Sequence, residues 1–277
     1  MLSVLDLFSS DHTAMTSEQI AEALSLTRTT CYRYTRELSQ AGLLVSHGGW
    51  FMLGPRIIEL DRRMRGSDPL INAGGPLVAA LANSTGSTGL ISASYSETTV
   101  NVFEHVASAK PLPMSFGRGT TMPMFRSSTS KVLLAAMSRG RLRRLWERHQ
   151  SDPDCRAIGS EWRDFWRNLQ EISRVGYSVS FGELNAELAG ISSVITYSDG
   201  EAAGCLSLVF MRDEFMRYDA QLLGSRLRAA ATDLSQILGR PGAETVEVSK
   251  PAPVRRRSSS GAAKSETARK GTKNPAR

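Results

Sequence analysis

The sequence has few cysteines and histidines, and neither type is clustered. Cys31, Cys155 and Cys205 form no CxxC pair, and the four histidines form no HExxH motif. This spacing excludes the familiar zinc signatures and favours buried thiols over redox sensing. A P-loop, a dinucleotide-binding glycine fingerprint and a GxSxG motif are also absent from the sequence. We therefore expect no cofactor, no metal site and no enzymatic activity.

Long apolar runs are absent too, since none reaches the roughly 18 residues that a membrane-spanning helix needs. The first residues, MLSVLDLFSSDH, lack the basic region and cleavage site of a signal peptide, and Leu2, Leu5 and Phe8 fit an amphipathic helix instead. The chain has 277 residues, of which 41% are hydrophobic. That is enough for two domains, each with its own core. These features predict a cytoplasmic globular protein with no membrane partner.

The net charge of +7 comes almost entirely from the C-terminal tail. Residues 241–277 contain nine Lys and Arg against three Glu, so they carry +6 and the rest of the chain +1. Because this segment is rich in Pro, Ser, Ala and Gly and poor in large apolar residues, we predict a disordered basic tail. Two roles stay open for it: keeping the protein in solution, or contacting DNA through charge without reading its sequence.

Residues 16–53 have the pattern of a winged helix-turn-helix. Thr16 or Ser17 can cap a first short helix, and Thr27 can cap a second one after a tight turn. Apolar residues at helical spacing give both helices an inward face. The chain then folds back around His47-Gly48-Gly49, which predicts a hairpin wing.

The outward face of the second helix is rich in hydroxyl and guanidinium groups. Such groups contact base edges and phosphates when a recognition helix enters the major groove. We therefore predict DNA binding by this face and the wing, through Arg28, Thr29, Thr30, Tyr32, Arg33, Arg36 and His47. An alternative stays open, because small helices with a hairpin also occur in interaction domains whose outward face is only solvated.

The rest of the chain predicts a linker helix and then an α+β module. PRIIELDRRMRG at 55–66 has a proline in its first turn and a terminal glycine, as a short connecting helix would. Beyond it, we expect helices at 68–84, 127–137, 139–150, 161–175 and 215–238 and strands at 90–97, 99–108, 177–181, 190–197 and 202–211. This order describes an antiparallel sheet with flanking helices.

Five stretches, in this order, resemble the IclR family of bacterial transcription regulators. They are EQIAEALSLTRTTCYRYTRELSQAGLL, WFMLGPRIIEL, GRGTTMPMFRSSTSKVLLAAM, GYSVSFGELNAELAGISSVI and GCLSLVF. The resemblance covers about residues 2–240. It implies a winged helix-turn-helix DNA-binding domain at 1–54, a linker helix at 55–67 and a GAF-like effector-binding and oligomerisation domain at 68–240.

The resemblance also implies an effector pocket between the sheet and the loop before the 127–137 helix. Carried over to this sequence, its residues are Met122, Phe125, Ser127, Ser128, Glu183, Ser192, Ser193 and Ser207. The family's ligands are typically small carboxylates, aromatic acids or signalling lactones, and a helix start suits a carboxylate. Ser192-Ser193 stands where some members of the family have Cys, so the resemblance does not identify the ligand. Ser127 also has a simpler explanation as a helix cap.

From these features we predict a sequence-specific regulator of transcription, controlled by a small organic acid and bound to a palindromic operator in double-stranded DNA as a homodimer or dimer of dimers. Repression and activation both stay open, with repressor as our working assignment. The main alternative is a small-molecule-binding protein or an enzyme with a vestigial N-terminal domain. Against an enzyme, Glu183 has no His or Lys beside it in a matching motif. A nucleoid protein acting through its basic tail would leave the second domain unexplained.

Overall fold

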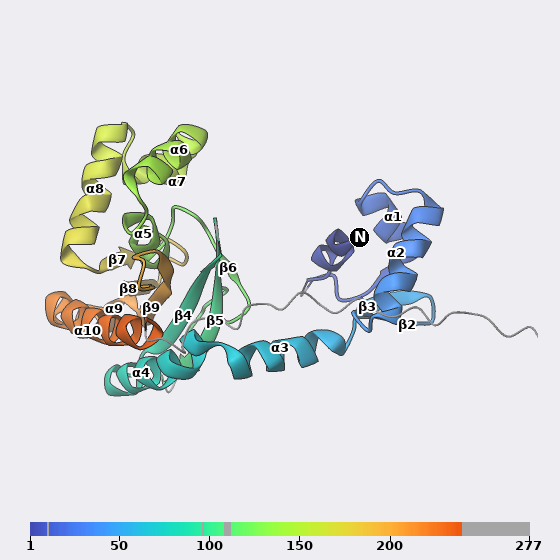
Figure 1. Ribbon diagram of the computed structural model, residues 1–277, viewed down its shortest axis with the longest axis horizontal. Helices are drawn as coiled ribbons and strands as arrows, with labels where there is room; N and C mark the ends of the chain where they lie inside the picture. The colour runs from blue at the N-terminus through green and yellow to red at the C-terminus, as the bar shows by residue number, and fades with distance from the viewer. Residues whose placement is uncertain (10, 96, 108–111, 240–277) are drawn as a thin grey trace, which may run out of the picture. The chain divides into compact units, whose positions relative to one another are not determined.

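The computed structural model describes residues 1–9, 11–95, 97–107 and 112–239, and the predicted basic tail at 241–277 lies outside them. Two groups of elements follow one another along the chain (Figure 1). We call Met1–Leu53, with a three-stranded sheet, the N-terminal module, and Pro69–Leu238, with a six-stranded sheet, the C-terminal module. The helix α3 (Arg56–Ser67) joins them in sequence. Within the described ranges, every helix is too short or too polar to cross a bilayer.

The N-terminal module has the element order of a winged helix. Its elements are η1 (Leu2–Leu7, a 3-10 helix), β1 (Met15–Thr16), α1 (Ser17–Ala23), α2 (Arg28–Gln40), β2 (Leu44–His47) and β3 (Trp50–Leu53). The strands pair in the order β1-β3-β2, all antiparallel. The amphipathic helix predicted at the N-terminus is a 3-10 helix that buries Val4 and packs Leu5 against the core, while Leu2, predicted on the same face, is exposed. The two-residue strand β1 was missed, since it is too short to show an alternating pattern.

Side-chain caps set where both helices of this module begin. Thr16 Oγ1 accepts the N–H of Gln19 at 3.3 Å, and Gln19 Oε1 accepts the N–H of Thr16 at 2.8 Å, which makes a complete capping box. Thr27 is the cap of α2, as predicted. Cys31 and Leu38 are buried in the module's apolar core, as their spacing predicted.

The C-terminal module is an antiparallel sheet with helices on both faces. Its strands are β4 (Thr88–Tyr95), β5 (Thr98–Val106), β6 (Thr121–Met122), β7 (Ser178–Phe181), β8 (Leu188–Thr196) and β9 (Ala202–Met211), in the order β6-β5-β4-β9-β8-β7. Its helices are α4 (Pro69–Thr85), α5 (Ser128–Ala135), α6 (Arg139–His149), α7 (Pro153–Ile158), α8 (Trp162–Val175), α9 (Arg212–Phe215) and α10 (Ala220–Leu238). The predicted α+β class is confirmed.

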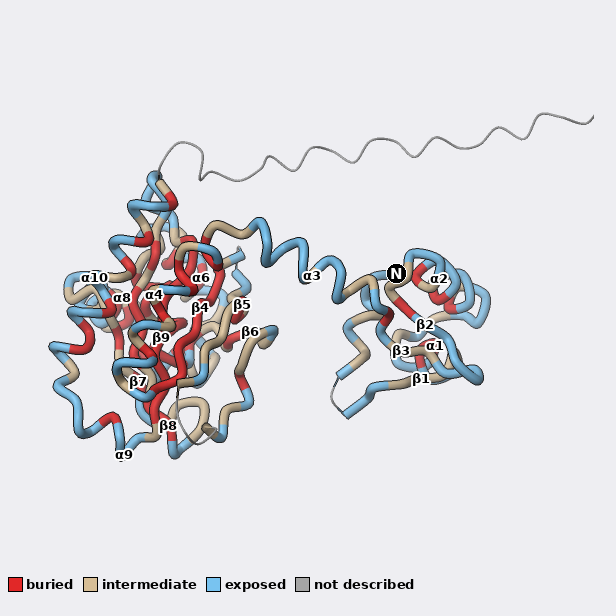
Figure 2. Tube along the Cα trace, turned by 90° about the horizontal axis from the view of Figure 1, so that it is seen from below, coloured by how far each residue is buried: buried red, intermediate tan, exposed pale blue. Residues whose placement is uncertain are grey.

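The central strands are buried on both faces of the sheet. Successive residues of a strand therefore pack alternately against the helices on one face and those on the other. In β9, Leu206, Leu208 and Phe210 join the large apolar core formed with α4 and α10. Ser207 and Val209, which point the other way, face α5 and the loop before it. The strands form the continuous buried centre of the module in Figure 2. The sheet therefore has one face that is apolar and one that is partly polar.

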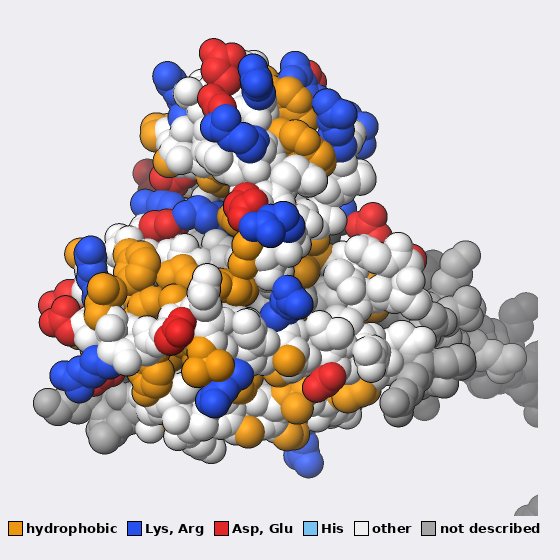
Figure 3. Space-filling model, turned by 90° about the vertical axis from the view of Figure 1, so that its left-hand side faces the viewer, with side chains coloured by type: hydrophobic (Ala, Val, Ile, Leu, Met, Phe, Trp, Pro, Cys, Tyr) orange, Lys and Arg blue, Asp and Glu red, His pale blue; other side chains and the backbone are white. Residues whose placement is uncertain are grey.

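The helices α6, α7 and α8 form a second core of their own around Phe165. Trp146, Trp162 and Trp166 pack at its edge, and the Arg143 guanidinium lies 5.0 Å from the Trp162 ring centroid. Cations and acids are intermixed over the face of the C-terminal module shown in Figure 3. This face therefore does not offer a patch of one charge sign.

Two helix predictions in this module need correction. The helix predicted at 215–238 begins only at Ala220, because Asp219 caps its start by accepting the N–H groups of Gln221 and Leu222, and the short helix α9 precedes it. The short helix α7 was missed, although Asp152 caps it and Pro153 occupies its first position. In both places the helix begins where an Asp side chain caps it, and the spacing of the apolar residues does not indicate that start.

Replacing Thr16 with Ala should lower the free energy of unfolding by ~1 kcal/mol, because the N–H of Gln19 in the first turn of α1 loses the hydroxyl that accepts it. Urea unfolding of the full chain measures the change. Thr13 is the matched control, since it is exposed and makes no side-chain hydrogen bond within the described residues. Equal losses for Thr16→Ala and Thr13→Ala would contradict the capping role.

Candidate functional site

The outward face of α2 presents cations that are not neutralised within the protein. Arg28, Arg33 and Arg36 are exposed, and among the described residues none of them forms an ion pair. Thr29 is also exposed, and the Tyr32 side chain is 65% exposed. Guanidinium groups in this state keep all their donors for an external acceptor such as a phosphate or a guanine edge.

Thr30 and His47 differ from the rest of the predicted DNA-binding set. Thr30 is half-buried, and its Oγ1 accepts the hydroxyl of Thr27 at 2.9 Å, so it belongs to the cap of α2. His47 is exposed at the end of β2, where it pairs with Trp50 across the hairpin. Trp50 is 45% exposed and was not predicted, although strand alternation would have placed it at the wing.

A narrow pocket, with a volume of about 30 Å³, lies between the start of α5, the strands β4, β8 and β9 and two loops. One side carries hydroxyl groups, and the other is apolar. The polar lining is Ser127, Ser128, Thr129, Ser180, Glu183, Asn185 and Ser207. The apolar lining includes Leu90, Phe116, Met122, Leu184, Leu188 and Val209. This composition suits a small molecule with an apolar body and a few polar groups. Because the pocket is narrow, such a molecule would have to displace side chains of the lining as it enters.

Buried hydroxyls form a continuous network behind the polar side. Ser192 Oγ lies 2.8 Å from Ser128 Oγ and 2.7 Å from Ser207 Oγ. Thr129 Oγ1 lies 3.0 Å from Ser207 Oγ and so closes a ring between α5 and the sheet. Each hydroxyl both donates and accepts, so the network can reorient when a polar ligand group enters.

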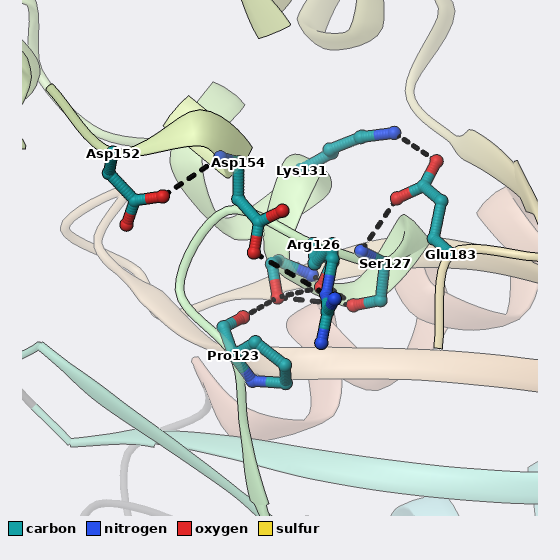
Figure 4. Close-up of polar contacts among 8 residues, drawn as sticks. Pro123, Arg126, Ser127, Lys131, Asp152, Asp154 and Glu183 are labelled. Carbon is teal, nitrogen blue, oxygen red and sulfur yellow. Dashed lines mark hydrogen bonds and ion pairs between the residues drawn. The ribbon is translucent and has the colours of Figure 1, made fainter. Parts of the chain in front are cut away.

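Glu183 is paired from two sides at the start of α5 (Figure 4). Its Oε2 accepts the N–H of Ser127 at 2.8 Å, and its Oε1 forms an ion pair with the Lys131 ammonium. The side chains of Lys131 and Glu183 are 21% and 25% exposed, so the pair is partly shielded from water. The sequence pattern indicates no basic partner for Glu183, whereas in the structure Lys131 balances its charge.

Ser127 adopts a backbone conformation that residues other than glycine rarely have. Its φ is +102° and its ψ is 157°, a region that costs of order 1–3 kcal/mol for an L side chain. The surroundings hold it there: Glu183 accepts its N–H, and its Oγ accepts the N–H of Ser130 at 3.2 Å. Such strain is typical of functional sites. Ser127 is therefore the cap of α5 and a wall of the pocket at once.

Five of the eight predicted effector-site residues line the pocket: Met122, Ser127, Ser128, Glu183 and Ser207. Ser192 lies behind them in the hydroxyl network. The structure does not bring Ser193 there, because adjacent strand residues face opposite ways and its Oγ donates to the Gly176 carbonyl oxygen. Phe125 also lies elsewhere, in the core of α6–α8, with its ring centroid 5.4 Å from that of His149.

Thr129, Phe116 and Lys131 are pocket or pocket-edge residues that the sequence analysis did not name. Thr129 follows Ser127 and Ser128 directly, so the run of hydroxyls was a usable signal. Phe116 lies in an irregular loop, where no periodicity indicates which side chain turns inward. Lys131 lies one helical turn after Ser127, but its partner Glu183 is distant in sequence.

The three cysteines are free and buried, as predicted. Burial, with a smaller contribution from Asp152, raises the pKa of Cys155 to about 11, and burial also raises the pKa of Cys31 and Cys205. At neutral pH they are therefore thiols and weak nucleophiles. Among the described residues, no group of three or more His, Cys, Asp or Glu could hold a metal ion.

Two family models match the chain, and together they cover most of it. The model described as "Bacterial transcriptional regulator IclR C-terminal" matches residues 65–236, and the model described as "IclR helix-turn-helix domain" matches residues 1–48. The chain is also similar to the Pca operon regulatory protein of Acinetobacter baylyi. The two are 24% identical over 217 residues, which are 75% of this chain and 76% of that protein.

Solved structures share the fold. An IclR transcriptional regulator from Alicyclobacillus acidocaldarius matches with a TM-score of 0.72 and 20% identity, over 86% of this chain and 96% of that one. An IclR homologue from Microbacterium hydrocarbonoxydans, in complex with 4-hydroxybenzoate, matches with a TM-score of 0.68 and 22% identity, over 86% and 96% of the two chains.

Replacing Ser127 with Ala should destabilise the protein more than replacing it with Gly, because both variants lose the capping hydroxyl but only Ala keeps a Cβ at positive φ. Ser138, the cap of α6 at φ −59°, is the matched control, since its Ala and Gly variants differ only in capping. We expect the Ala–Gly difference in unfolding free energy to be about 1 kcal/mol larger at Ser127 than at Ser138. Equal differences in urea unfolding would show that Ser127 is not strained.

Proposed function

Because this chain belongs to the IclR family of bacterial transcriptional regulators, we propose that it is a sequence-specific regulator controlled by a small organic acid. The two matching family models describe transcriptional regulators and their helix-turn-helix domain, which favours a regulator over an enzyme. We propose that residues 1–54 bind double-stranded DNA at a palindromic operator and that residues 68–240 bind the effector and form the oligomer. Residues 55–67 would be the linker helix between these two domains. The protein would act in the cytoplasm.

The observation that carries the DNA-binding proposal is the unpaired cationic face of α2. Arg28, Arg33 and Arg36 occupy one exposed helix face with no acid bound to them among the described residues. Glu37 lies four residues after Arg33, but the two form no ion pair in the described residues, whereas Arg143 and Glu147 at the same spacing do. Keeping the arginines free favours an anionic partner outside the protein, and the helix-turn-helix context makes that partner DNA.

Apolar side chains on α3 support a homodimer. Ile58 is 73% exposed, and Leu60 and Met64 are each 44% exposed, so this helix buries none of its own residues within the chain. Large apolar groups are costly to leave in water. A second copy of the chain would cover them, and a two-fold dimer would place two recognition helices on the two halves of a palindrome.

The pocket supports an acid with an aromatic or apolar body. The N–H groups of Ser128 and Thr129, at the start of α5, donate to no protein acceptor within the described residues, so they suit a ligand carboxylate. The Lys131–Glu183 pair removes the repulsion that a lone carboxylate would exert on an anion. The homologue bound to 4-hydroxybenzoate makes hydroxylated aromatic acids the first class to test.

Arg33→Ala should abolish most of the preference for the operator, since losing a base contact on the recognition helix costs about 1–3 kcal/mol of discrimination. The operator is first selected from random duplex DNA with the wild-type chain, and anisotropy titrations then compare it with a scrambled duplex at physiological salt. Arg163→Ala, which removes an exposed arginine from α8, is the control and should leave the preference unchanged. An unaltered preference in Arg33→Ala would mean that α2 does not read DNA.

Gly190→Ala should weaken effector binding by about tenfold or more, since an added methyl group overfills the polar side of the pocket. A Cβ there would lie 3.0 Å from Ser128 Oγ and 3.2 Å from Ser180 Oγ. Calorimetry with a panel of small acids that includes 4-hydroxybenzoate measures the loss. Gly140→Ala is the control, because its Cβ would meet only Arg144, at 3.8 Å. If an acid bound the wild type and Gly190→Ala equally well, its site would lie elsewhere.

A further inference from the structure

The loop Phe116–Met122 lines the pocket with one side and reaches the linker helix α3 with the other. Its pocket side consists of Phe116 and Met122, which are 8% and 6% exposed. Between them lies Arg118, whose guanidinium forms an ion pair with Asp61 of α3. Within a few residues, one short segment therefore contacts both the space where a ligand would lie and the helix that leads to the N-terminal module.

Asn101 of β5 holds this loop together. Its side chain is fully buried, and its Nδ2 donates to the Phe116 carbonyl oxygen at 2.6 Å and to Met122 Sδ at 3.3 Å. Its backbone N–H donates to the Thr120 carbonyl oxygen at 3.0 Å, and its carbonyl oxygen accepts the N–H of Gly119 at 2.7 Å. The two ends and the middle of the loop are thus bonded to a single residue.

Ser92 completes this arrangement from the neighbouring strand, β4. Its Oγ donates to Asn101 Oδ1 at 2.6 Å, so the amide oxygen and both main-chain groups of Asn101 have partners. A fully satisfied buried amide resists local rearrangement, because any partial shift would leave a polar group unpaired. The loop therefore moves as a unit or not at all.

Arg118 is oriented by the strand on which the loop lies. Its N–H donates to Glu104 Oε2 at 2.9 Å, and its Nε donates to the Val102 carbonyl oxygen at 2.9 Å. A Cβ at Gly117 would lie only 2.7 Å from Glu104 Oε2, so a larger residue there would make the Glu104 carboxylate shift. These two hydrogen bonds fix the backbone and the Nε of Arg118, so its terminal guanidinium nitrogen points at the Asp61 carboxylate. The side chains of Arg118 and Asp61 are 30% and 34% exposed, so their attraction is only partly screened.

We propose that the Phe116–Met122 loop transmits pocket occupancy to α3, with Arg118 and Asp61 as the contact and Asn101 as the residue that makes the loop act as one piece. This proposal rests on the proposed function, since it describes how an effector pocket would influence DNA binding. A ligand that displaces Phe116 or Met122 displaces Arg118 with them. Asp61 follows, and α3 shifts toward the arrangement that the ligand favours.

The experiment is a double-mutant cycle on the full chain, read by amide hydrogen exchange of residues 58–64 in α3. Met122→Ala perturbs the pocket side of the loop, and Arg118→Gln removes the contact with Asp61. We expect Arg118→Gln to speed exchange in α3 by at least about threefold. Met122→Ala should change exchange in α3 when Arg118 is present, and by less than half as much in the Arg118→Gln background.

Two further sets of variants make the result specific. The exchanged pair, Arg118→Asp with Asp61→Arg, should restore the response of α3 to Met122→Ala, whereas either change alone should not. Arg126→Gln is the matched control, since Arg126 pairs with Asp154, Nε to Oδ2 at 3.4 Å, and makes no contact with α3. Phe116→Leu replaces Met122→Ala as the pocket-side change if the latter does not fold.

The proposal is overturned if the pocket-side change alters α3 equally with and without Arg118, or leaves it unchanged in both backgrounds. That failure is distinct from failure of the proposed function. If only the transmission route is wrong, the wild-type chain still prefers one operator over a scrambled duplex. If the proposed function is wrong, that preference is absent whatever the exchange of α3 shows.

Discussion

The antiparallel pairing of β8 with β9 is the constraint on which the pocket depends. Ser192 and Ser207 are paired in this ladder, and their hydroxyl oxygens lie 2.7 Å apart. Both strands are buried on both faces, so a slip of one residue would turn Ile191 and Leu208 toward the pocket and bring serines into the apolar core. The large core with α4 and α10 prevents that slip. The apolar face thus fixes the register, and the register brings the hydroxyl groups together on the other face.

The start of α5 combines several demands in a few residues. Ser127 caps the helix, has an unfavourable φ, and is followed by two amides with no protein acceptor. The hydrogen bond from its N–H to Glu183 stabilises this conformation. Lys131 in turn balances Glu183 from within the same helix. A change at any of these three positions would therefore alter the other two. Stability and ligand recognition are not separable here, which is common where a binding site stores backbone strain.

Local patterns predicted the fold well, because helical and alternating periodicities are properties of neighbouring residues. The capping residues Thr16 and Thr27 and the Gly-Gly wing could be read from short stretches in the same way. About half of the candidate site could also be read, since the hydroxyl run before α5 is continuous in sequence. The family resemblance predicted Phe125 and Ser193 in the pocket. Phe125 instead packs in the core of α6–α8, because of the course of the loop that carries it. Strand alternation excludes one of the two adjacent serines, Ser192 and Ser193, from the pocket side, and Ser193 is the one that faces away. Asn101 could not be found, because its importance lies in contacts with a loop 15 to 21 residues away.

The distribution of tryptophan has a practical consequence for spectroscopy. Trp146, Trp162 and Trp166 gather in the α6–α8 core, and the remaining one of the chain's four, Trp50, is in the wing. The tryptophan emission of the chain is therefore a sum of two signals: one from a packed, cation-flanked cluster and one from a partly solvated indole beside His47. No tryptophan lines the pocket. Quenching of the solvated component by an added duplex would report on the wing, while the clustered component serves as an internal reference within the same molecule.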